Sequence, residues 1–308
     1  MPTGKQAAIL KGAVLFFLLI GVLGTAFSYW VGGQLVAPRP AAIGLPPADL
    51  HAQSVDIATD SGVIRGWWIN GDPVKGAVLL LHGIRANRLA MVGRARLLSR
   101  HGYSVLLVDL QAHGESPGDA ITLGLRESTG VQAARAWIKL RHPGRPVAAI
   151  GVSLGGASIL LGPSPVGFDA VVLEAVYPDA RQALQNRMAM RFGGAAPLLS
   201  KLLEMQVRPR LGVSLEKLRP IDHIAGIGAP VMIVAGGRDQ HTTPAESRAL
   251  YARARAPKEL LILPDAAHQD FERHSPSIYE KHVITFLDQA LHAPCLDPNA
   301  NCGMSSQL

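Results

Sequence analysis

The sequence predicts an α/β fold with a mostly parallel sheet covered by helices on both faces. Short apolar runs alternate with segments of helical pattern from residue 77 onward. A hairpin pattern precedes this alternation, and one long helical stretch, residues 178–229, interrupts it late in the chain. Alternation of strands and helices is typical of parallel sheets that are buried between two helical layers.

The first two strands are expected to form an antiparallel hairpin. Residues 54–58 and 63–69 are strand-like and flank Asp60-Ser-Gly62, a sequence that favours a turn. The later strands are short apolar runs. We expect them at residues 77–81, 104–108, 146–150, 170–173, 230–235 and 259–264.

The connecting helices have recognisable ends. We expect helices at residues 88–101, at 125–140, after residue 153, and in the C-terminal region up to about residue 291. Ser275-Pro276 opens that last helix. Thr243-Pro-Ala-Glu246 is a capping box with proline at the first helical position, so another helix begins there.

The N-terminal segment is apolar enough to cross a membrane. No charged residue occurs from Gly12 to Pro38, and about 20 apolar residues suffice to span a bilayer as a helix. Tyr29 and Trp30 lie at its far end, where an interfacial aromatic belt belongs. We expect a transmembrane helix or signal anchor over residues 12–37. The alternative is a signal peptide cleaved near Gly24-Thr-Ala26, which would give a secreted protein.

The charges around this segment predict its orientation. Lys5 and Lys11 precede it, so the positive-inside rule keeps the N-terminus in the cytoplasm and puts the rest of the chain on the non-cytoplasmic side. The expected organisation is single-pass. An N-terminal flank, the span, a linker, one domain and a tail would occupy residues 1–11, 12–37, 38–50, 51–292 and 293–308.

Composition allows a large core and does not indicate a nucleic-acid partner. With 308 residues, 48% of them apolar, we expect one domain of about 250 residues plus extensions. The net charge is +7, but no basic run or basic–aromatic alternation indicates nucleic acid. A basic surface of this kind is expected to be solvated or to face anionic lipid head groups.

The only two cysteines, Cys295 and Cys302, both lie in the tail. Pro and Asn residues between them favour a turn that would bring the thiols together, and an oxidising compartment would allow a disulfide. Two unpaired thiols are the alternative. No histidine accompanies the cysteines, so we predict no metal site there.

One five-residue motif, Gly151-Val-Ser-Leu-Gly155, predicts a nucleophile. A strand-like run precedes it and a run of small residues follows, which is the strand–turn–helix context that G-x-S-x-G requires. Glycines are needed because the turn is sharp, and Ser153 at its apex must adopt a strained backbone conformation. A chain with 32 glycines can match by chance, so the motif needs partners.

Those partners follow in the order that this architecture requires. An activated serine needs a base, and the base needs an orienting carboxylate. Asp239 follows the strand at 230–235, and His268 follows the strand at 259–264. Asp265 is the nearest rival acid, but it stands only three residues before His268 on the same loop. We therefore predict a Ser153–Asp239–His268 triad.

Two backbone N–H groups are expected to bind the oxyanion. One belongs to Leu154, directly after the nucleophile, and the other to Ile84, after the strand at 77–81. His82 could be mistaken for the base. It precedes the nucleophile in the chain, so we expect its ring to brace the loop instead.

Taken together, these segments resemble the α/β-hydrolase superfamily, and the chain is similar to its membrane-associated serine hydrolases and esterases. Many relatives carry Arg-Gly where this chain has Gln111-Ala112, a departure in a turn that leaves the triad untouched. The resemblance covers about residues 50–292 and lies in Leu81-His-Gly-Ile84, Val108-Asp-Leu-Gln-Ala-His-Gly-Glu-Ser116, Gly151-Val-Ser-Leu-Gly-Gly156, Gly237-Arg-Asp239 and Ala267-His268.

The resemblance also implies a role for residues 178–229, the helical stretch that interrupts the alternation of strands and helices. An insertion between the sixth and seventh strands of this fold covers the nucleophile as a lid, here residues 178–229. Met188, Met190 and Phe192 make it apolar, which suits a small-molecule or lipid-like acyl substrate. These methionines could instead only pack the lid onto the domain.

The expected function is hydrolysis of an ester-type acyl bond by a membrane-anchored serine hydrolase, through an acyl-enzyme and without metal or organic cofactor. A peptidase or amidase with the same triad is the first alternative. A non-catalytic membrane-anchored binding protein is the second. The complete triad argues against it, because binding alone has no need of all three residues.

Overall fold

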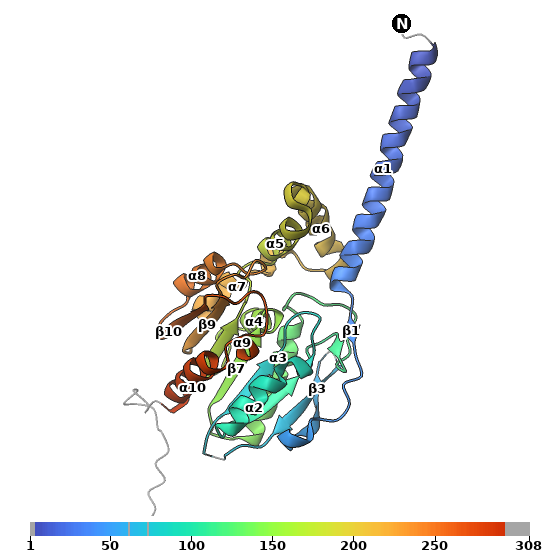
Figure 1. Ribbon diagram of the computed structural model, residues 1–308. Helices are drawn as coiled ribbons and strands as arrows, with labels where there is room; N and C mark the ends of the chain where they lie inside the picture. Colours follow the sequence, from blue (N-terminus) through green and yellow to red (C-terminus); the bar gives the residue numbers. More distant parts are fainter. Residues whose placement is uncertain (1–3, 61, 73, 293–308) are drawn as a thin grey trace, which may run out of the picture.

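The computed structural model describes residues 4–60, 62–72 and 74–292, and these contain an eight-stranded sheet with helices on both faces (Figure 1). The strand order is β10-β9-β8-β7-β4-β5-β3-β2, and only the pairs β2–β3 and β3–β5 are antiparallel. This confirms the predicted α/β fold and its N-terminal hairpin. The strands are β2 (Gln53–Thr59), β3 (Gly62–Ile69), β4 (Ala77–Leu81), β5 (Ser104–Val108), β7 (Val147–Val152), β8 (Ala170–Glu174), β9 (Val231–Gly236) and β10 (Lys258–Leu263).

The central strands are continuous apolar runs because both of their faces are covered. Every residue of β4, β5 and β8 is buried. Trp67 and Trp68 are neighbours in β3 and point to opposite sides, so each belongs to a different hydrophobic cluster. The sheet therefore separates two cores, which together hold the domain.

Helices from different parts of the chain close each core. One side carries α2 (Val92–Arg100), α9 (Phe271–His274) and α10 (Pro276–His292). The other carries α3 (Glu127–Arg141), α4 (Leu154–Leu160) and α8 (Pro244–Arg253), whose capping box at Thr243 and Glu246 is formed. The helix expected at 88–101 starts as a 3-10 turn, Arg88–Met91, because the Asn87 side chain caps Leu89 N.

The stretch between β8 and β9 is helical, as its pattern predicts. It contains α5 (Ala180–Phe192), α6 (Ala196–Leu211) and the short α7 (Pro220–His223), with 3-10 turns between them. Asp179 caps the start of α5, and Gly212 ends α6 in the left-handed conformation. In Figure 1 α5 and α6 lie on the same side of the domain as α1, and α6 runs beside its base.

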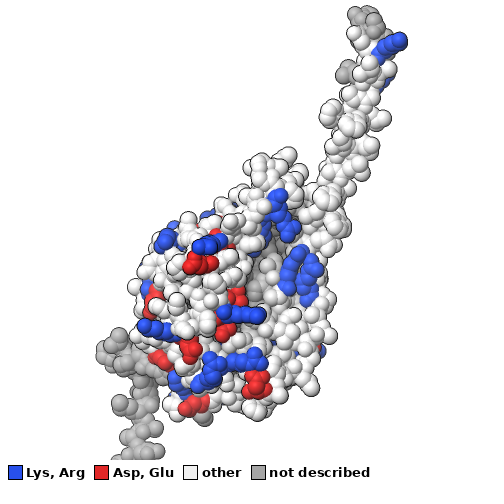
Figure 2. Space-filling view, viewed as in Figure 1, with Lys and Arg blue, Asp and Glu red and all other residues white. Residues whose placement is uncertain are grey.

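The N-terminal helix α1 (Gly4–Val36) begins earlier than the predicted span and projects from the domain (Figure 1). Its part from Lys11 to Val36 is 26 residues long with a mean hydropathy of 2.1, enough in length and composition for a membrane span or a signal sequence. On the face in Figure 2 most of α1 carries no charged side chain, and blue appears only towards its free end.

The expected linker, residues 38–50, is tied to the domain. β1 (Arg39–Pro40) pairs in parallel with β6 (His113–Gly114), and Ile43 N donates to Glu115 Oε1 at 3.1 Å. Ala112, where many relatives have glycine, adopts a positive φ of 62° in the same turn. Residues 48–50 (η1, Ala48–Leu50) then lead into β2. Cys295 and Cys302 lie outside the described residues.

Candidate active site

The turn between β7 and α4 holds Ser153 in a conformation that L-residues rarely adopt. Its φ is 48° and its ψ is −106°, and its N–H donates to Glu174 O at 2.8 Å. A Cβ at Gly151 would overlap the backbone of Gly156, and one at Gly155 would overlap Leu81 O. Both glycines are therefore required by close backbone approach, and strained residues of this kind are typical of functional sites.

The Ser153 hydroxyl is buried and has no hydrogen-bond partner among the described residues. A Cβ on Gly83 would stand 3.7 Å from Ser153 Cβ, so the loop after β4 lies against Ser153. Ile84 and Leu154 line the same pocket as Ser153, and within the described chain neither backbone N–H donates to a protein acceptor. Both predicted oxyanion donors are thus unpaired next to the serine.

Asp239 and His268 form a hydrogen-bonded pair across two neighbouring loops. His268 Nδ1 and Asp239 Oδ2 are 2.8 Å apart, and Asp239 Oδ1 accepts from the N–H groups of His241 and Thr242 at 2.8 and 2.9 Å. The Asp239 side chain is fully buried, whereas 22% of the His268 side chain is exposed. Asp265, the rival acid, instead binds Arg238 on the surface at 2.7 Å.

In the structure the predicted site residues form two separate groups. Asp239 bonds His268, and Ser153 shares a pocket with Ile84 and Leu154, but Ser153 and His268 are not hydrogen-bonded to each other. Catalytic hydrogen bonds are often loose without substrate. Within residues 4–60, 62–72 and 74–292 no group of three His, Cys, Asp or Glu side chains could hold a metal ion.

His241 is a site residue that the sequence analysis missed. Its ring lies 4.8 Å from that of His268, between centroids, and its Nδ1 is buried without a partner. Burial, followed by the charges of His268 and Arg187, lowers the pKa of His241. The sequence signal that could have indicated His241 is its position two residues after Asp239, on the loop whose backbone N–H groups bind the Asp239 carboxylate.

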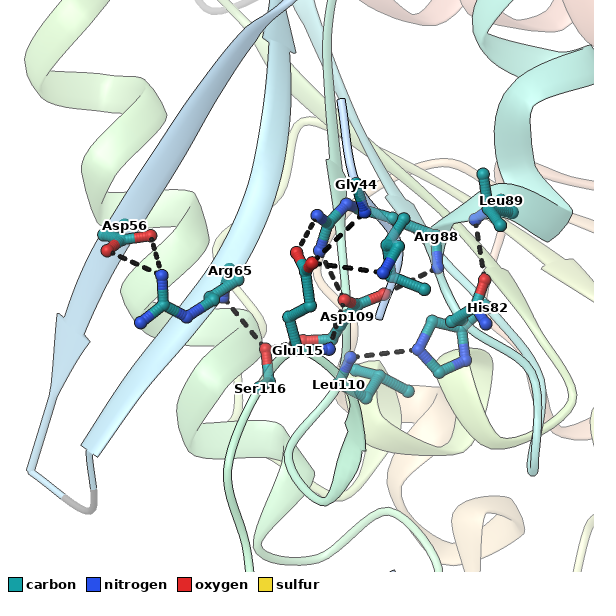
Figure 3. Close-up of polar contacts among 12 residues, drawn as sticks. Gly44, Asp56, Arg65, His82, Arg88, Leu89, Asp109, Leu110, Glu115 and Ser116 are labelled. Atoms are coloured by element: carbon teal, nitrogen blue, oxygen red, sulfur yellow. Dashed lines mark hydrogen bonds and ion pairs between the residues drawn. The ribbon is translucent and has the colours of Figure 1, made fainter. Parts of the chain in front are cut away.

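Behind the loop that follows β4, buried polar groups fix the backbone (Figure 3). His82 Nδ1 donates to Gly83 O at 2.8 Å and its Nε2 accepts from Leu110 N at 3.0 Å, which confirms the bracing role expected for this ring. Burial lowers the pKa of His82 to about 3, so the ring is neutral. Arg88 bridges Asp109 and Glu115 in the same cluster.

A second buried network supports the Ser153 turn from the end of β8. Arg94 Nε and Nη2 bind the two carboxylate oxygens of Glu174 at 3.0 and 2.6 Å, and Tyr279 OH donates to the same group at 2.6 Å. Glu174 O is the acceptor for Ser153 N. The ion pair therefore positions the strand end to which the serine turn is attached, and Glu174 is not available to His268.

A pocket of about 130 Å³ opens above Ser153 and is walled mostly by apolar side chains. Tyr177 and Leu123 line it, as do Leu184 of α5 and Leu203 and Val207 of α6. An apolar pocket with few polar groups suits an acyl or similar group next to the serine. Exclusion of water also strengthens electrostatic interactions with a developing oxyanion.

Comparison with known proteins agrees with this geometry. A model of the Alpha/beta hydrolase family matches residues 78–278, which include all five predicted site residues. An uncharacterised protein of Mycobacterium tuberculosis is 29% identical over 257 residues, covering 82% of this chain and 84% of that protein. YfhR of Escherichia coli K12, also uncharacterised, is 25% identical over 279 residues, with 86% and 88% covered. The solved esterase Pf2001 of Pyrococcus furiosus superposes with a TM-score of 0.67 at 26% identity, over 82% of this chain and 99% of that one.

Proposed function

The chain belongs to the alpha/beta hydrolase family, and from that premise we propose that it is a serine hydrolase of ester-type acyl bonds. The observation that carries the proposal is the pairing of His268 with the buried carboxylate of Asp239, on the same edge of the sheet as the strained Ser153. A structural histidine–aspartate pair would need neither the strained serine nor the two unpaired N–H groups beside it.

The proposed reaction proceeds in two acyl transfers. His268 Nε2 takes the Ser153 Oγ proton as this oxygen attacks the substrate carbonyl, and Asp239 stabilises the imidazolium. The N–H groups of Ile84 and Leu154 bind the oxyanion. The imidazolium then protonates the leaving alcohol, which leaves an acyl-enzyme. Water, deprotonated by the same imidazole, attacks this ester, and the carboxylic acid and free Ser153 are released.

One comparison favours ester substrates over amides, and the pocket indicates that the substrate carries an acyl group. The solved structure of 26% identity is an esterase, and the pocket next to Ser153 has apolar walls that suit an acyl chain. We also propose that α1 anchors the protein as a single-pass helix, with the hydrolase domain on the non-cytoplasmic side and the α5–α6 region acting as a lid over the serine.

Active-site labelling tests the proposed chemistry. Wild-type protein should react with a fluorophosphonate and hydrolyse p-nitrophenyl esters, whereas the Ser153→Ala variant should do neither. Matched p-nitroanilides of the same acyl groups should react more slowly. Faster turnover of the anilides would identify an amidase, and labelling that persists in Ser153→Ala would show that another residue is the nucleophile.

A further inference from the structure

The end of the N-terminal helix forms part of the pocket over the nucleophile. Gly32, Leu35 and Val36 of α1 line this pocket together with Ser153 and the helices α5 and α6. Leu35 also packs on the small hydrophobic cluster built by Met188 and Leu203. A helix that served only as an anchor would have no reason to form a wall of the substrate pocket.

Specific contacts hold this end of α1 on the domain. Arg210 of α6 donates to Tyr29 O, and its guanidinium lies 3.8 Å from the centroid of the Tyr29 ring. Gln206 Nε2 donates to Ser28 Oγ at 2.9 Å, and Arg85 Nη2 donates to the backbone oxygen of Gln34 at 2.6 Å. The wall is therefore docked on two sides, by α6 and by the oxyanion loop.

The length of α1 predicts the height of the pocket relative to a bilayer. The apolar part, Lys11–Val36, has 26 residues, whereas about 20 helical residues cross the hydrocarbon core. About six residues at the C-terminal end thus extend beyond it, just after Tyr29 and Trp30, the residue types of the interfacial belt. The pocket would lie at the level of the lipid head groups, next to the acyl chains.

The neighbouring helices present apolar side chains at the same level. Met190 and Phe192 of α5 and Leu198 and Met205 of α6 are exposed, the last two by 68% and 66%. Figure 1 shows that these helices lie on the side of the domain from which α1 projects. Exposed apolar groups grouped in this way mark a surface that contacts a membrane or a partner.

Arginine side chains lie in the pocket and beside the end of α1. Arg187 and Arg210 line the pocket, and none of Arg39, Arg85, Arg187, Arg191 and Arg210 forms an ion pair in the described part of the chain. Burial, followed by the like charges of Arg39 and Arg191, lowers the pKa of Arg85. In Figure 2 basic side chains flank a hollow near the base of α1. Arginine forks are suited to phosphate oxygens.

We propose that the substrate is a long-chain acyl ester of a membrane glycerophospholipid, which enters from the leaflet with its acyl chain between α1 and α6 and its phosphate among the arginines. This inference rests on the proposed function and specifies its substrate class. It makes α1 a substrate-binding element in addition to a membrane anchor, because Leu35 of α1 and Val207 of α6 line the same pocket.

Proteoliposomes of palmitoyl-oleoyl phosphatidylglycerol that contain the full-length protein provide the test. Fatty-acid release is measured by mass spectrometry, p-nitrophenyl acetate hydrolysis in parallel, and fluorophosphonate labelling reports an intact serine site. Wild type should release fatty acid. Leu35→Trp, which fills the pocket, should lower the ratio of fatty-acid release to acetate hydrolysis about tenfold or more. Val207→Trp should do the same from α6, and Leu23→Trp, on the exposed part of α1, should change neither rate.

Three results would overturn the inference. The first is an unchanged ratio of fatty-acid release to acetate hydrolysis in both Leu35→Trp and Val207→Trp, when both variants still react with the fluorophosphonate. The second is a wild-type protein that hydrolyses the acetate and releases no fatty acid. The third is an equal rate of fatty-acid release from a diacylglycerol with the same acyl chains, mixed into the vesicles, which would show that the phosphate has no role in binding. Absence of both labelling and acetate hydrolysis in wild type would instead overturn the serine-hydrolase proposal, and this one with it.

Discussion

The imidazole of His241 lies against that of His268, with ring centroids 4.8 Å apart. Both residues are tied to Asp239, His268 through its ring and His241 through its backbone N–H. Burial lowers the pKa of His241, so its ring is neutral when His268 is the base. A neutral ring can contact the imidazolium that forms during catalysis without repelling it.

A permanent charge at position 241 should therefore impair the proposed base. In His241→Lys, repulsion disfavours the His268 imidazolium, so kcat should fall about tenfold and the acid limb of the pH–rate profile should move to lower pH by about one unit. His241→Gln is the neutral control and should keep the wild-type profile. Profiles of kcat and of kcat/KM against pH on p-nitrophenyl acetate measure both effects. An unshifted acid limb in His241→Lys would contradict electrostatic coupling between the rings.

Loss of either proposed triad partner of Ser153 should cost activity without unfolding the domain. Asp239→Asn leaves the buried amide next to His268 but favours the wrong tautomer, so kcat should fall by about 10⁴, and His268→Ala should cost a similar factor. Thermal unfolding of His268→Ala should stay near that of wild type, because its side chain is partly exposed. Activity of Asp239→Asn within tenfold of wild type would argue for a different orienting acid.

The buried ring of His82 should make stability depend on acid pH. The unfolded chain binds a proton at this histidine below about pH 6.5, whereas the folded state, with a pKa of about 3, does not. Protonation thus favours unfolding as pH falls through that window, by up to about 1.4 kcal/mol per pH unit. His82→Gln lacks this contribution, so its unfolding free energy should fall less steeply between pH 6.5 and 5. The unfolding free energies can be measured by urea denaturation at several pH values. An equally steep fall in the two proteins between pH 6.5 and 5 would contradict the assignment.

The orientation of α1 can be read with reporter fusions. Lys5 and Lys11 precede the span, so a domain on the non-cytoplasmic side should give an active alkaline phosphatase when this reporter follows residue 292. Green fluorescent protein at the same site should stay dark. Replacement of both lysines by glutamine should weaken the preference, since they carry the orienting charge. Fluorescence without phosphatase activity would mean the opposite topology.

Much of the fold could be predicted because parallel strands that are buried on both faces have continuous apolar sequences. β4 and β5 coincide with the predicted segments, and β8 differs by a single residue, Glu174. That residue escaped the prediction because its charge is compensated by Arg94, 80 positions away. Long-range ion pairs of this kind leave no periodic signal along the chain.

The candidate site was predictable to the extent that turn geometry restricts residue type. Gly151 and Gly155 mark the serine turn because a side chain at either position would overlap the neighbouring backbone. The neighbours of the triad were not visible, since contact between His241 and His268 depends on how two separate loops fold back on each other. For the same reason, the pattern of α1 indicated a membrane span and gave no sign that Leu35 borders the pocket.

The parallel pairing of Arg39–Pro40 with His113–Gly114 has a kinetic consequence under the proposed membrane anchoring. Because the helix end and the following strand are both fixed to the domain, the serine of the proposed anchored enzyme would keep a constant depth and would not sample the aqueous phase on a flexible tether. Encounters then occur by lateral diffusion in two dimensions. Turnover in vesicles should saturate with the mole fraction of substrate lipid and stay insensitive to dilution of the vesicles, as expected for interfacial catalysis.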